Sequence, residues 1–452
     1  MAHVLIIGAG ISGLSVAEFL REHHQVTVLE AGPEPGGKVR SEHVDGFTFD
    51  RAANGWLDNE PAMQRLLERL NLGQQLIQGP VGDPRYVVHQ GQMVALPSKP
   101  QGLVGSPLLS IGAKLRLIWE LFAPGFDGEE SIGQFMRRRI GPQPTERLVQ
   151  PFVTGIYAGD VDHLSMQACF PVLKELESKH GSLWRAVRKQ GRPIPGRLTS
   201  LRGGSGELGQ ALAARNTVLF NHRAIEISHN QGQWTVVSDQ GTHHADALVL
   251  AGPGHAMAQL QGLDPTLAGT MGAIPYAPVA VVCQGLPKDG WAPPKGFGVL
   301  VPKAEKLGIL GTLFSSSIFP SRAPADGIIL RTLVGGALFP RQAALESDAL
   351  LEIVRRDNAK LLGPLPKPRV TRVYKHARAI PQYTLGHTGR VAAVREASQA
   401  HPGLFVTGNH LDGVAVKSCA SAGEKLAGAV IDYLQGQHLC DSPFASRTPL
   451  TD

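Results

Sequence analysis

The sequence predicts an α/β fold built on a parallel sheet whose strands come from distant parts of the chain. A short apolar segment at residues 3–7 leads into a glycine turn and a helical pattern, and a second apolar segment follows at 25–29. Similar short segments return at residues 217–220, 245–250 and 404–409. The 452 residues suffice for two or three domains with sizeable cores. We therefore expect one sheet that is interrupted by long insertions.

The first turn carries the pattern Gly8-Ala9-Gly10-Ile11-Ser12-Gly13. Gly8 permits a tight turn, Gly10 lets the backbone approach a pyrophosphate, and Gly13 lets the helix pack closely on the strand. The helix N-terminus adds partial positive charge and free N–H groups. The pattern predicts a Rossmann-like dinucleotide site, with Ile11 and Ser12 among its cofactor-binding residues.

Glu30 ends the second strand, where a carboxylate can accept hydrogen bonds from both ribose hydroxyls of a dinucleotide. A carboxylate there repels a 2′-phosphate, so FAD or NAD is favoured over NADP. The following segment, which contains Ala31 and Gly36-Gly37-Lys38, resembles the second dinucleotide element of glutathione-reductase-type and amine-oxidase-like flavoproteins. In those proteins the element lies along the flavin side of a permanently held FAD. The resemblance implies FAD, with these four residues among its contacts.

Folds of this type are discontinuous, and the returning segments fit that organisation. A helix that opens within residues 201–208 leads to strands at 217–220, 224–227, 234–237 and 245–250. The last return is a strand at 404–409, a glycine turn at Gly413 and a helix at 418–434. We expect the FAD-binding domain to comprise residues 1–54, 196–264 and 386–440.

The insertions predict an α+β substrate-binding domain from residues 55–100 and 265–385. It should contain a hairpin of residues 85–88 and 93–96, strands at 277–282 and 328–334, and a helix near 348–362. Residues 101–195 should form a helical, membrane-proximal subdomain, and residues 441–452 a flexible tail.

Composition argues against several other classes. Only 18% of residues are charged, and the net charge of +6 is scattered without basic runs among aromatic residues, so nucleic-acid binding is not expected. Cys169, Cys283, Cys419 and Cys440 form no Cys-x-x-Cys pair, which predicts no metal site, no redox disulfide and a cytoplasmic location. The longest uncharged segment, residues 265–287, is broken by glycines and prolines, so no transmembrane helix is predicted.

Residues 107–122 are apolar at many positions, with Lys114 and Arg116 nearby. One interpretation is a buried helix of the subdomain. The alternative is a helix on the membrane surface, whose apolar side enters lipid while the basic residues meet headgroups. The second interpretation would place the protein peripherally on the cytoplasmic face of the inner membrane.

Four segments, in order along the chain, resemble the oxygen-dependent protoporphyrinogen oxidases, and the resemblance covers most of the sequence. They are residues 154–160, 296–302, 380–387 and 413–419. The resemblance implies a six-electron oxidation in haem biosynthesis, in which FAD removes three hydrides and three O₂ become three H₂O₂. The flavin carries this chemistry, so no catalytic side chain is expected. The porphyrinogen and O₂ are the implied partners, and a homodimer stays open.

The preferred substrate is protoporphyrinogen IX, and coproporphyrinogen III, which has two more propionates, is the alternative. Another amine-oxidase-like oxidase or desaturase, or a flavin-binding protein without turnover, also stays open.

By the same resemblance, Arg85 pairs with a substrate propionate, Gly298, Leu300 and Leu333 line the macrocycle, and Asn54 lies near both substrate and flavin. The implied FAD contacts further along the chain are Ala52, Asn54, Gly55, Ala224, Ile225, Gly408, Val414, Ala415 and Val416. Tyr383 and His387 are interpreted as structural. The sequence departs from the family pattern at Ala52, Ala53, Lys417, Ser418 and Thr388, so the details of flavin contact there are open.

Overall fold

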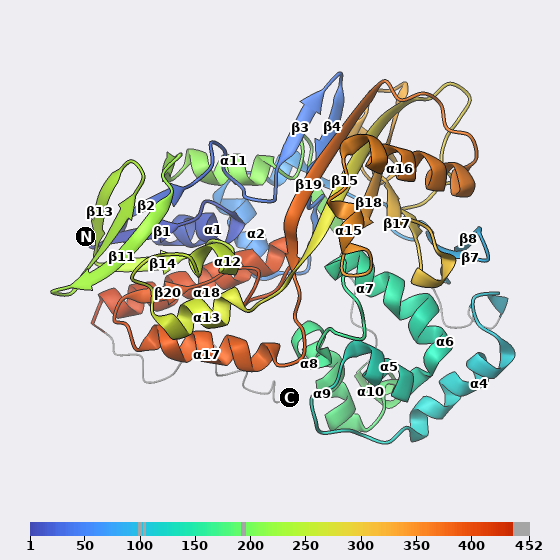
Figure 1. Cartoon of the computed structure of the whole chain (residues 1–452), viewed down its shortest axis with the longest axis horizontal. Coiled ribbons are helices and arrows are strands. Elements are labelled where there is room, and N and C mark those ends of the chain that lie inside the picture. The colour runs from blue at the N-terminus through green and yellow to red at the C-terminus, as the bar shows by residue number, and fades with distance from the viewer. Residues whose placement is uncertain (98–101, 103–104, 191–195, 437–452) are drawn as a thin grey trace.

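The computed structural model describes residues 1–97, 102, 105–190 and 196–436, and a five-stranded parallel sheet lies at one end of it (Figure 1). Its strand order is β10-β2-β1-β14-β20, so the returning segments do join the first two strands. The strands are β1 (His3–Ile7), β2 (Gln25–Glu30), β10 (Thr217–Phe220), β14 (Ala247–Leu250) and β20 (Leu404–Val406).

This sheet is buried on both faces, as parallel sheets generally are. Val4 and Ile6 face a core shared with α1 (Ile11–Leu20) and α18 (Val416–Leu434). Leu5 and Ile7 face the opposite core. That core is shared with α12 (Gly254–Met257), α13 (Pro265–Gly272), α17 (His387–Gln399) and the meander β11 (Ala224–Asn230), β12 (Gln233–Ser238) and β13 (Gly241–Ala245).

Two predicted strands differ from the structure. The segment at 245–250 is divided, because Asp246 leaves the ladder and accepts a hydrogen bond from the backbone N of His3 at 2.7 Å. The strand predicted at 404–409 ends at Val406, and Gly408 then takes a φ of +150° that favours glycine. Both differences occur where the backbone turns towards the candidate site or the N-terminus.

A seven-stranded mixed sheet forms the other large layer, in the order β19-β15-β18-β17-β16-β7-β8. The helix α16 (Ser347–Leu362) covers one face, and Phe47 and Phe49 of β4 pack on the other. The predicted hairpin, strands and helix of this region are present. The bounds are β19 (Val370–Pro381), β15 (Tyr276–Pro287), β18 (Gly327–Gly335), β17 (Ile309–Phe314), β16 (Gly298–Leu300), β7 (Arg85–His89), β8 (Gln92–Ala95), β3 (Ser41–Val44) and β4 (Phe47–Asp50).

Shorter elements connect the two large sheets. A small antiparallel sheet has the order β5-β9-β6. Its strands are β5 (Trp56–Leu57), β9 (Leu198–Leu201) and β6 (Leu76–Gln78), and the neighbouring helices are α2 (Pro61–Arg69) and α11 (Glu207–Ala214).

The helical region is held by a buried ionic network. Arg139, fully buried, donates to Glu177 and Glu120. Glu120 also accepts from the backbone N of Leu183 at 2.7 Å. The helices are α4 (Ile111–Ile118), α5 (Ile132–Ile140), α6 (Pro142–Pro144), α7 (Gln150–Tyr157), α8 (Met166–Cys169), α9 (Pro171–His180) and α10 (Leu183–Gln190), with a short 3₁₀ turn at Trp119–Phe122.

The interpretation of residues 107–122 as a buried helix is wrong for α4. None of the residues of α4 is buried, and Ile111 is 78% exposed; in the 3₁₀ turn that follows, Trp119 is 65% and Phe122 70% exposed. Leu108 and Leu109, which precede α4, are buried. Arg116 donates to the backbone carbonyl oxygens of Arg138 and Arg139, so it serves packing within the protein. Among the described residues, none of the helices has both the length and the apolar character that crossing a bilayer requires.

Three cysteines, Cys169, Cys283 and Cys419, are free and buried. Cys440 and the predicted tail at 441–452 lie outside the described residues.

Candidate functional site

In the glycine turn after β1, Gly8 and Gly13 are closely packed and Gly10 is open, as the sequence predicted. Gly8 has a φ of +109°, and a Cβ placed on Gly13 would lie 2.1 Å from the carbonyl oxygen of Gly8. No atom lies within 4 Å of a Cβ placed on Gly10. Gly10 also begins α1 without a capping side chain, so the N–H groups of the first helical turn are available to an anion.

The second glycine element lies directly against the first. Gly36 forms a bridge with Gly10, and its backbone N donates to the carbonyl oxygen of Ala9 at 2.8 Å. Gly37 touches Gly10, since a Cβ on Gly37 would lie 3.2 Å from the Gly10 Cα. The two elements that the sequence assigned to one cofactor therefore form one surface.

The Glu30 carboxylate hydrogen bonds to the backbone of two loops beside this surface. Its Oε2 accepts from the backbone N of Ala9, and its Oε1 accepts from the backbone N of Gly32, each at 2.8 Å. Each carboxylate oxygen keeps further acceptor capacity, which suits the ribose contacts predicted for it. The backbone carbonyl of Glu30 accepts from His222, which brings the loop before β11 alongside, with Ala224 and Ile225 at the start of that strand.

The C-terminal helix α18 packs on α1 and brings its own N-terminus to the same place. Ile11 of α1 shares a core with Val416 and Cys419 of α18. Ala415 caps α18 without a side-chain hydrogen bond. Of the predicted contacts, Val416 thus reaches the first turn, Ala415 precedes it as the N-cap of α18, and Val414 packs against the helical region, whereas Gly408 lies just after β20.

Lys38 places a half-buried cation beside this surface. Its Nζ lies 5.4 Å from the centre of the Tyr276 ring, and no carboxylate of the described residues pairs with it. Burial lowers the pKa of Lys38 to about 8. An anionic ligand would stabilise the charged form, so this environment fits a phosphate-bearing cofactor.

Four of the five residues predicted to contact the substrate, all except Asn54, share one face of the seven-stranded sheet. Arg85 pairs with Gly298 across β7 and β16, and Leu300 pairs with Gly311, which pairs with Leu333. Since alternate residues of a strand point to the same face, the two rows line up side by side. The structure therefore brings Arg85, Gly298, Leu300 and Leu333 together.

The two ends of this face differ in character. Arg85 is exposed, and its guanidinium lies over the ring of Phe297, 4.6 Å from the ring centre. Leu300 lies under α7, because a Cβ on Gly155 would come within 3.3 Å of its Cδ2. The face thus offers a cation at an open rim and an apolar surface below α7.

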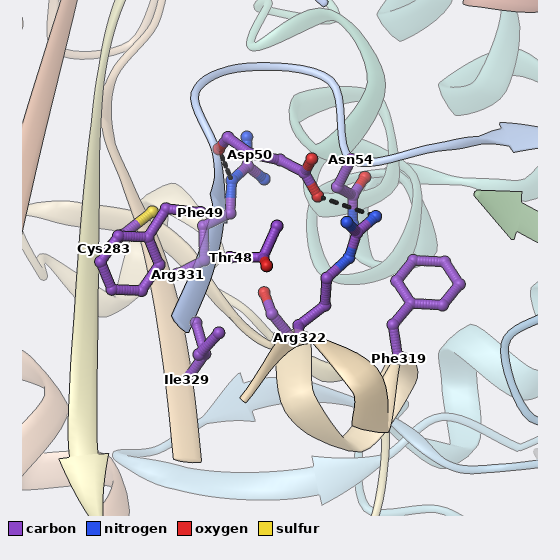
Figure 2. A pocket seen from close by; sticks show the side chains of 10 residues that line it. Thr48, Phe49, Asp50, Asn54, Cys283, Phe319, Arg322, Ile329 and Arg331 are labelled. Carbon is purple, nitrogen blue, oxygen red and sulfur yellow. Dashed lines mark hydrogen bonds and ion pairs between the residues drawn. The ribbon is translucent and has the colours of Figure 1, made fainter. Parts of the chain in front are cut away.

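The loop after β4 joins this face to the glycine surface, and an arginine that sequence reasoning missed holds it. Arg331 of β18 donates to the backbone carbonyl oxygens of Asp50 and Ala52. Figure 2 shows Arg331 and Arg322 with Asp50 around a small cavity that Asn54 also lines. The sequence did carry a signal for this role: Arg331 lies inside an apolar strand, where an unpaired charge would be costly, so it needs hydrogen-bond partners.

Comparisons with known proteins agree with these features. A family model described as flavin containing amine oxidoreductase matches residues 11–431. The chain is 32% identical to protoporphyrinogen oxidase 2, chloroplastic/mitochondrial, of Arabidopsis thaliana, over 96% of this chain and 94% of that protein. It is 27% identical to coproporphyrinogen III oxidase of Bacillus subtilis (strain 168), over 96% of this chain and 98% of that protein.

Solved structures give the same result for the fold. A protein of Exiguobacterium sp. 255-15, described as a candidate protoporphyrinogen oxidase, superposes with a TM-score of 0.85 at 25% identity, over 95% of this chain and 98% of that one. Cyclohexylamine oxidase from Brevibacterium oxydans shares the fold with a TM-score of 0.72 at 18% identity, over 96% and 99% of the two chains. The open turn at Gly10, the uncapped α1 and Lys38 fit FAD, the cofactor of such enzymes. The chain therefore belongs to the flavin containing amine oxidoreductase family, as an FAD-dependent oxidoreductase related to the protoporphyrinogen and coproporphyrinogen III oxidases.

Proposed function

We propose that this enzyme oxidises protoporphyrinogen IX to protoporphyrin IX with O₂. The substrate loses six electrons and six protons, and three O₂ take them up as three H₂O₂. The observation that carries the proposal is the single sheet face on which Arg85, Gly298, Leu300 and Leu333 line up. The similarity to a protoporphyrinogen oxidase over nearly the whole chain supports the same reaction.

The residues divide into those that hold FAD and those that hold the macrocycle. We assign FAD to the glycine turn at 8–13, Glu30, the segment 36–38 and the start of α18, and to Ala31, Ala52, Asn54, Gly55, Ala224, Ile225 and Gly408. Bound FAD would supply the hydride acceptor. Leu300 and Leu333 offer apolar surface to the flat ring, and Gly298 allows β16 to pair closely with β17 beside them, because a Cβ at this position would lie 2.3 Å from the carbonyl oxygen of Thr312.

Arg85 is proposed to pair with a propionate at the rim. A guanidinium can bind a carboxylate through two parallel hydrogen bonds, and its contact with Phe297 keeps it extended over the sheet. The substrate is thereby oriented while its apolar face stays against the leucines.

The row of arginines across the sheet favours protoporphyrinogen over coproporphyrinogen. The row contains Arg85, Arg331 and Arg372. Arg331 is occupied by the carbonyl groups of the loop after β4, and Arg372 is paired with Glu42 at 2.6 Å. Within this row Arg85 remains for a propionate, which suits a substrate with two propionates better than one with four.

The domain division proposed for this function has three parts. Residues 1–54, 196–264 and 386–436 would bind FAD, residues 55–97 and 265–385 would bind the macrocycle, and the helices of residues 111–190 would cover it. We also propose that α4 and the turn at Trp119–Phe122 make peripheral contact with the cytoplasmic face of a membrane. The exposed apolar side chains that support this contact are Ile111, Leu115, Ile118, Trp119 and Phe122.

The test supplies the purified, FAD-loaded protein with each porphyrinogen in air and follows porphyrin fluorescence and peroxide. Protoporphyrin formation with three peroxides per porphyrin supports the proposal. Faster turnover of coproporphyrinogen III would support the second candidate, which the similarity to the Bacillus subtilis enzyme favours. A protein that holds FAD but oxidises neither substrate would leave another oxidase, a desaturase or a flavin-binding role without turnover.

A further inference from the structure

Tyr383 lies just after β19 and is not among the residues assigned above to FAD or substrate. Its side chain is almost completely buried, with 3% exposed. The hydroxyl donates to the backbone carbonyl oxygen of Asn409 at 2.5 Å and accepts from the backbone N of Gly413 at 2.9 Å. These two backbone groups bracket the loop between β20 and α18, directly before Val414.

This loop depends on side chains for its shape, because it belongs to no helix or strand. Gly408 and Gly413 have φ values of +150° and +114°, which few other residues adopt. At the first end of the loop, the Asp412 carboxylate accepts from the Thr407 hydroxyl at 2.9 Å and from the backbone N of Gly408 at 3.3 Å. At the other end, the Tyr383 hydroxyl provides the corresponding support.

Tyr383 is itself held rigidly. Its ring stacks on His387 with centres 4.0 Å apart, and the Tyr157 ring lies 5.9 Å away. Its carbonyl oxygen accepts from the backbone N of Ser165 at 2.7 Å, which connects it to the helical region. Burial raises the pKa of Tyr383 well above its usual value, so the phenol stays protonated and keeps its donor.

We infer that Tyr383 is a positioning residue for FAD, which acts through the loop at 408–413 and the N-terminus of α18. The hydroxyl holds the Gly413 backbone where Val414, Ala415 and Val416 face the cofactor. This inference rests on the FAD contacts proposed for those three residues and is independent of which substrate is oxidised. This proposed role would add to the sequence interpretation of Tyr383 as a structural residue.

The test replaces Tyr383 by phenylalanine, which keeps the ring and its stacking but removes the hydroxyl. FAD affinity is measured by titrating the apoprotein, and the bound flavin is followed by its visible absorption and circular dichroism. We expect FAD to bind about tenfold more weakly, because a buried N–H and a buried carbonyl lose their partner. The circular dichroism of the bound flavin should also change, because the loop beside it moves.

Tyr157→Phe is the matched control. The Tyr157 hydroxyl donates to the carbonyl oxygen of Cys169 at 3.3 Å, and its ring belongs to the same buried cluster as Tyr383. It makes no hydrogen bond to the 408–413 loop. We expect FAD affinity within about twofold of the wild type and an unchanged flavin spectrum.

Unchanged FAD affinity and spectrum in Tyr383→Phe would overturn the inference, and so would equal losses in both variants. A second measurement needs no variant: in the FAD-loaded wild type, the Gly413 amide should exchange with solvent slowly, because the phenol occupies it. Rapid exchange of that amide would also overturn the inference. Failure of the porphyrinogen assay alone would leave all these results untouched.

Discussion

The guanidinium of Arg331 donates a hydrogen bond to the backbone carbonyl oxygen of Ala52, which ties strand β18 to the loop after β4. The Nε of Arg331 also donates to the carbonyl of Asp50 at 3.2 Å, and His376 contacts the carbonyl of Arg51 at 3.0 Å. This loop leads to Asn54, which is proposed to lie near both flavin and substrate. Strands β18 and β19 are thus joined by hydrogen bonds to the loop that leads to the proposed flavin and substrate contacts.

Arg331→Lys should lower kcat/KM for the porphyrinogen about tenfold, because a single ammonium group cannot reach both carbonyl oxygens as the planar guanidinium does. Steady-state kinetics at saturating FAD measures this effect. Arg372→Lys is the control, since Arg372 lies in the same row but pairs with Glu42 near the surface. Similar kinetics in the two variants would contradict a specific role for the Arg331 contacts.

The parts of the site that could be predicted from the sequence are those with local signals. The glycine turn and Glu30 lie within a short β-α-β unit, and the segment 36–38 follows it closely, so spacing along the chain determines most of their geometry. The hydrogen bond from Arg331 to Ala52 spans 279 positions, and no local pattern reports such a contact. The hydrogen bonds of the Tyr383 hydroxyl follow no local pattern either, because the carbonyl of Asn409 and the amide of Gly413 lie 26 and 30 residues away.

The sheet face proposed to bind the substrate was predictable only in part. A resemblance pointed to Arg85, Gly298, Leu300 and Leu333, but their common face depends on the register of four strands, which the sequence does not contain. The orientation of residues 107–122 was equally hard to predict, because an apolar segment has the same sequence pattern whether its side chains are buried or exposed. The buried Glu120, which accepts hydrogen bonds from Ser182 and Leu183, anchors the turn around it, and Trp119 and Phe122 lie on its exposed side.

Glu30→Gln should weaken FAD binding about tenfold. The carboxylate accepts from the backbone N of Ala9 and of Gly32, and an amide would turn its NH₂ group towards one of these donors. The ratio of flavin to protein after desalting, and titration of the apoprotein with FAD, measure the effect. Unchanged flavin content would count against the proposed ribose contact.

Lys38 should make FAD affinity depend on pH. Burial lowers its pKa to about 8 without FAD, and the phosphates of bound FAD would favour the ammonium form and raise that pKa. Because the bound state then holds the proton more tightly, affinity is greatest below pH 8 and falls as pH rises through 8 towards the pKa of the complex.

Titrations of the apoprotein with FAD at several pH values between about 7 and 9.5 test this. Lys38→Arg keeps the charge but does not titrate in this range, so its affinity at pH 7 should be retained while the decline disappears. Lys38→Met should bind FAD weakly at every pH. If the FAD affinity of Lys38→Met falls with pH as steeply as that of the wild type, another group causes the pH dependence.

Arg85→Ala should raise KM for the porphyrinogen about tenfold while kcat changes less, because the propionate contact is present in both ground state and transition state. Arg85→Lys should give an intermediate KM, since an ammonium group binds a carboxylate without the two parallel hydrogen bonds. Fluorescence-monitored kinetics over a range of substrate concentrations separates the two constants. A large fall in kcat with unchanged KM would instead move Arg85 into a transition-state role.

The exposed apolar surface of α4 and the following turn should mediate membrane contact. Trp119 and Phe122 flank the buried Glu120, which accepts hydrogen bonds from Arg139 and from the backbone N of Leu183. These bonds hold the turn in place, and because Trp119 and Phe122 are exposed, they contribute to no hydrophobic core of the protein. Replacing both residues by serine should reduce the fraction that sediments with anionic vesicles at low salt at least several-fold, with thermal stability unchanged. Val81→Ser, at a position 74% exposed in a different region, is the control and should sediment like the wild type. Equal sedimentation of the double variant and the wild type would mean that contact with lipid, if made, uses another surface, because these two side chains are the most exposed apolar groups of the turn.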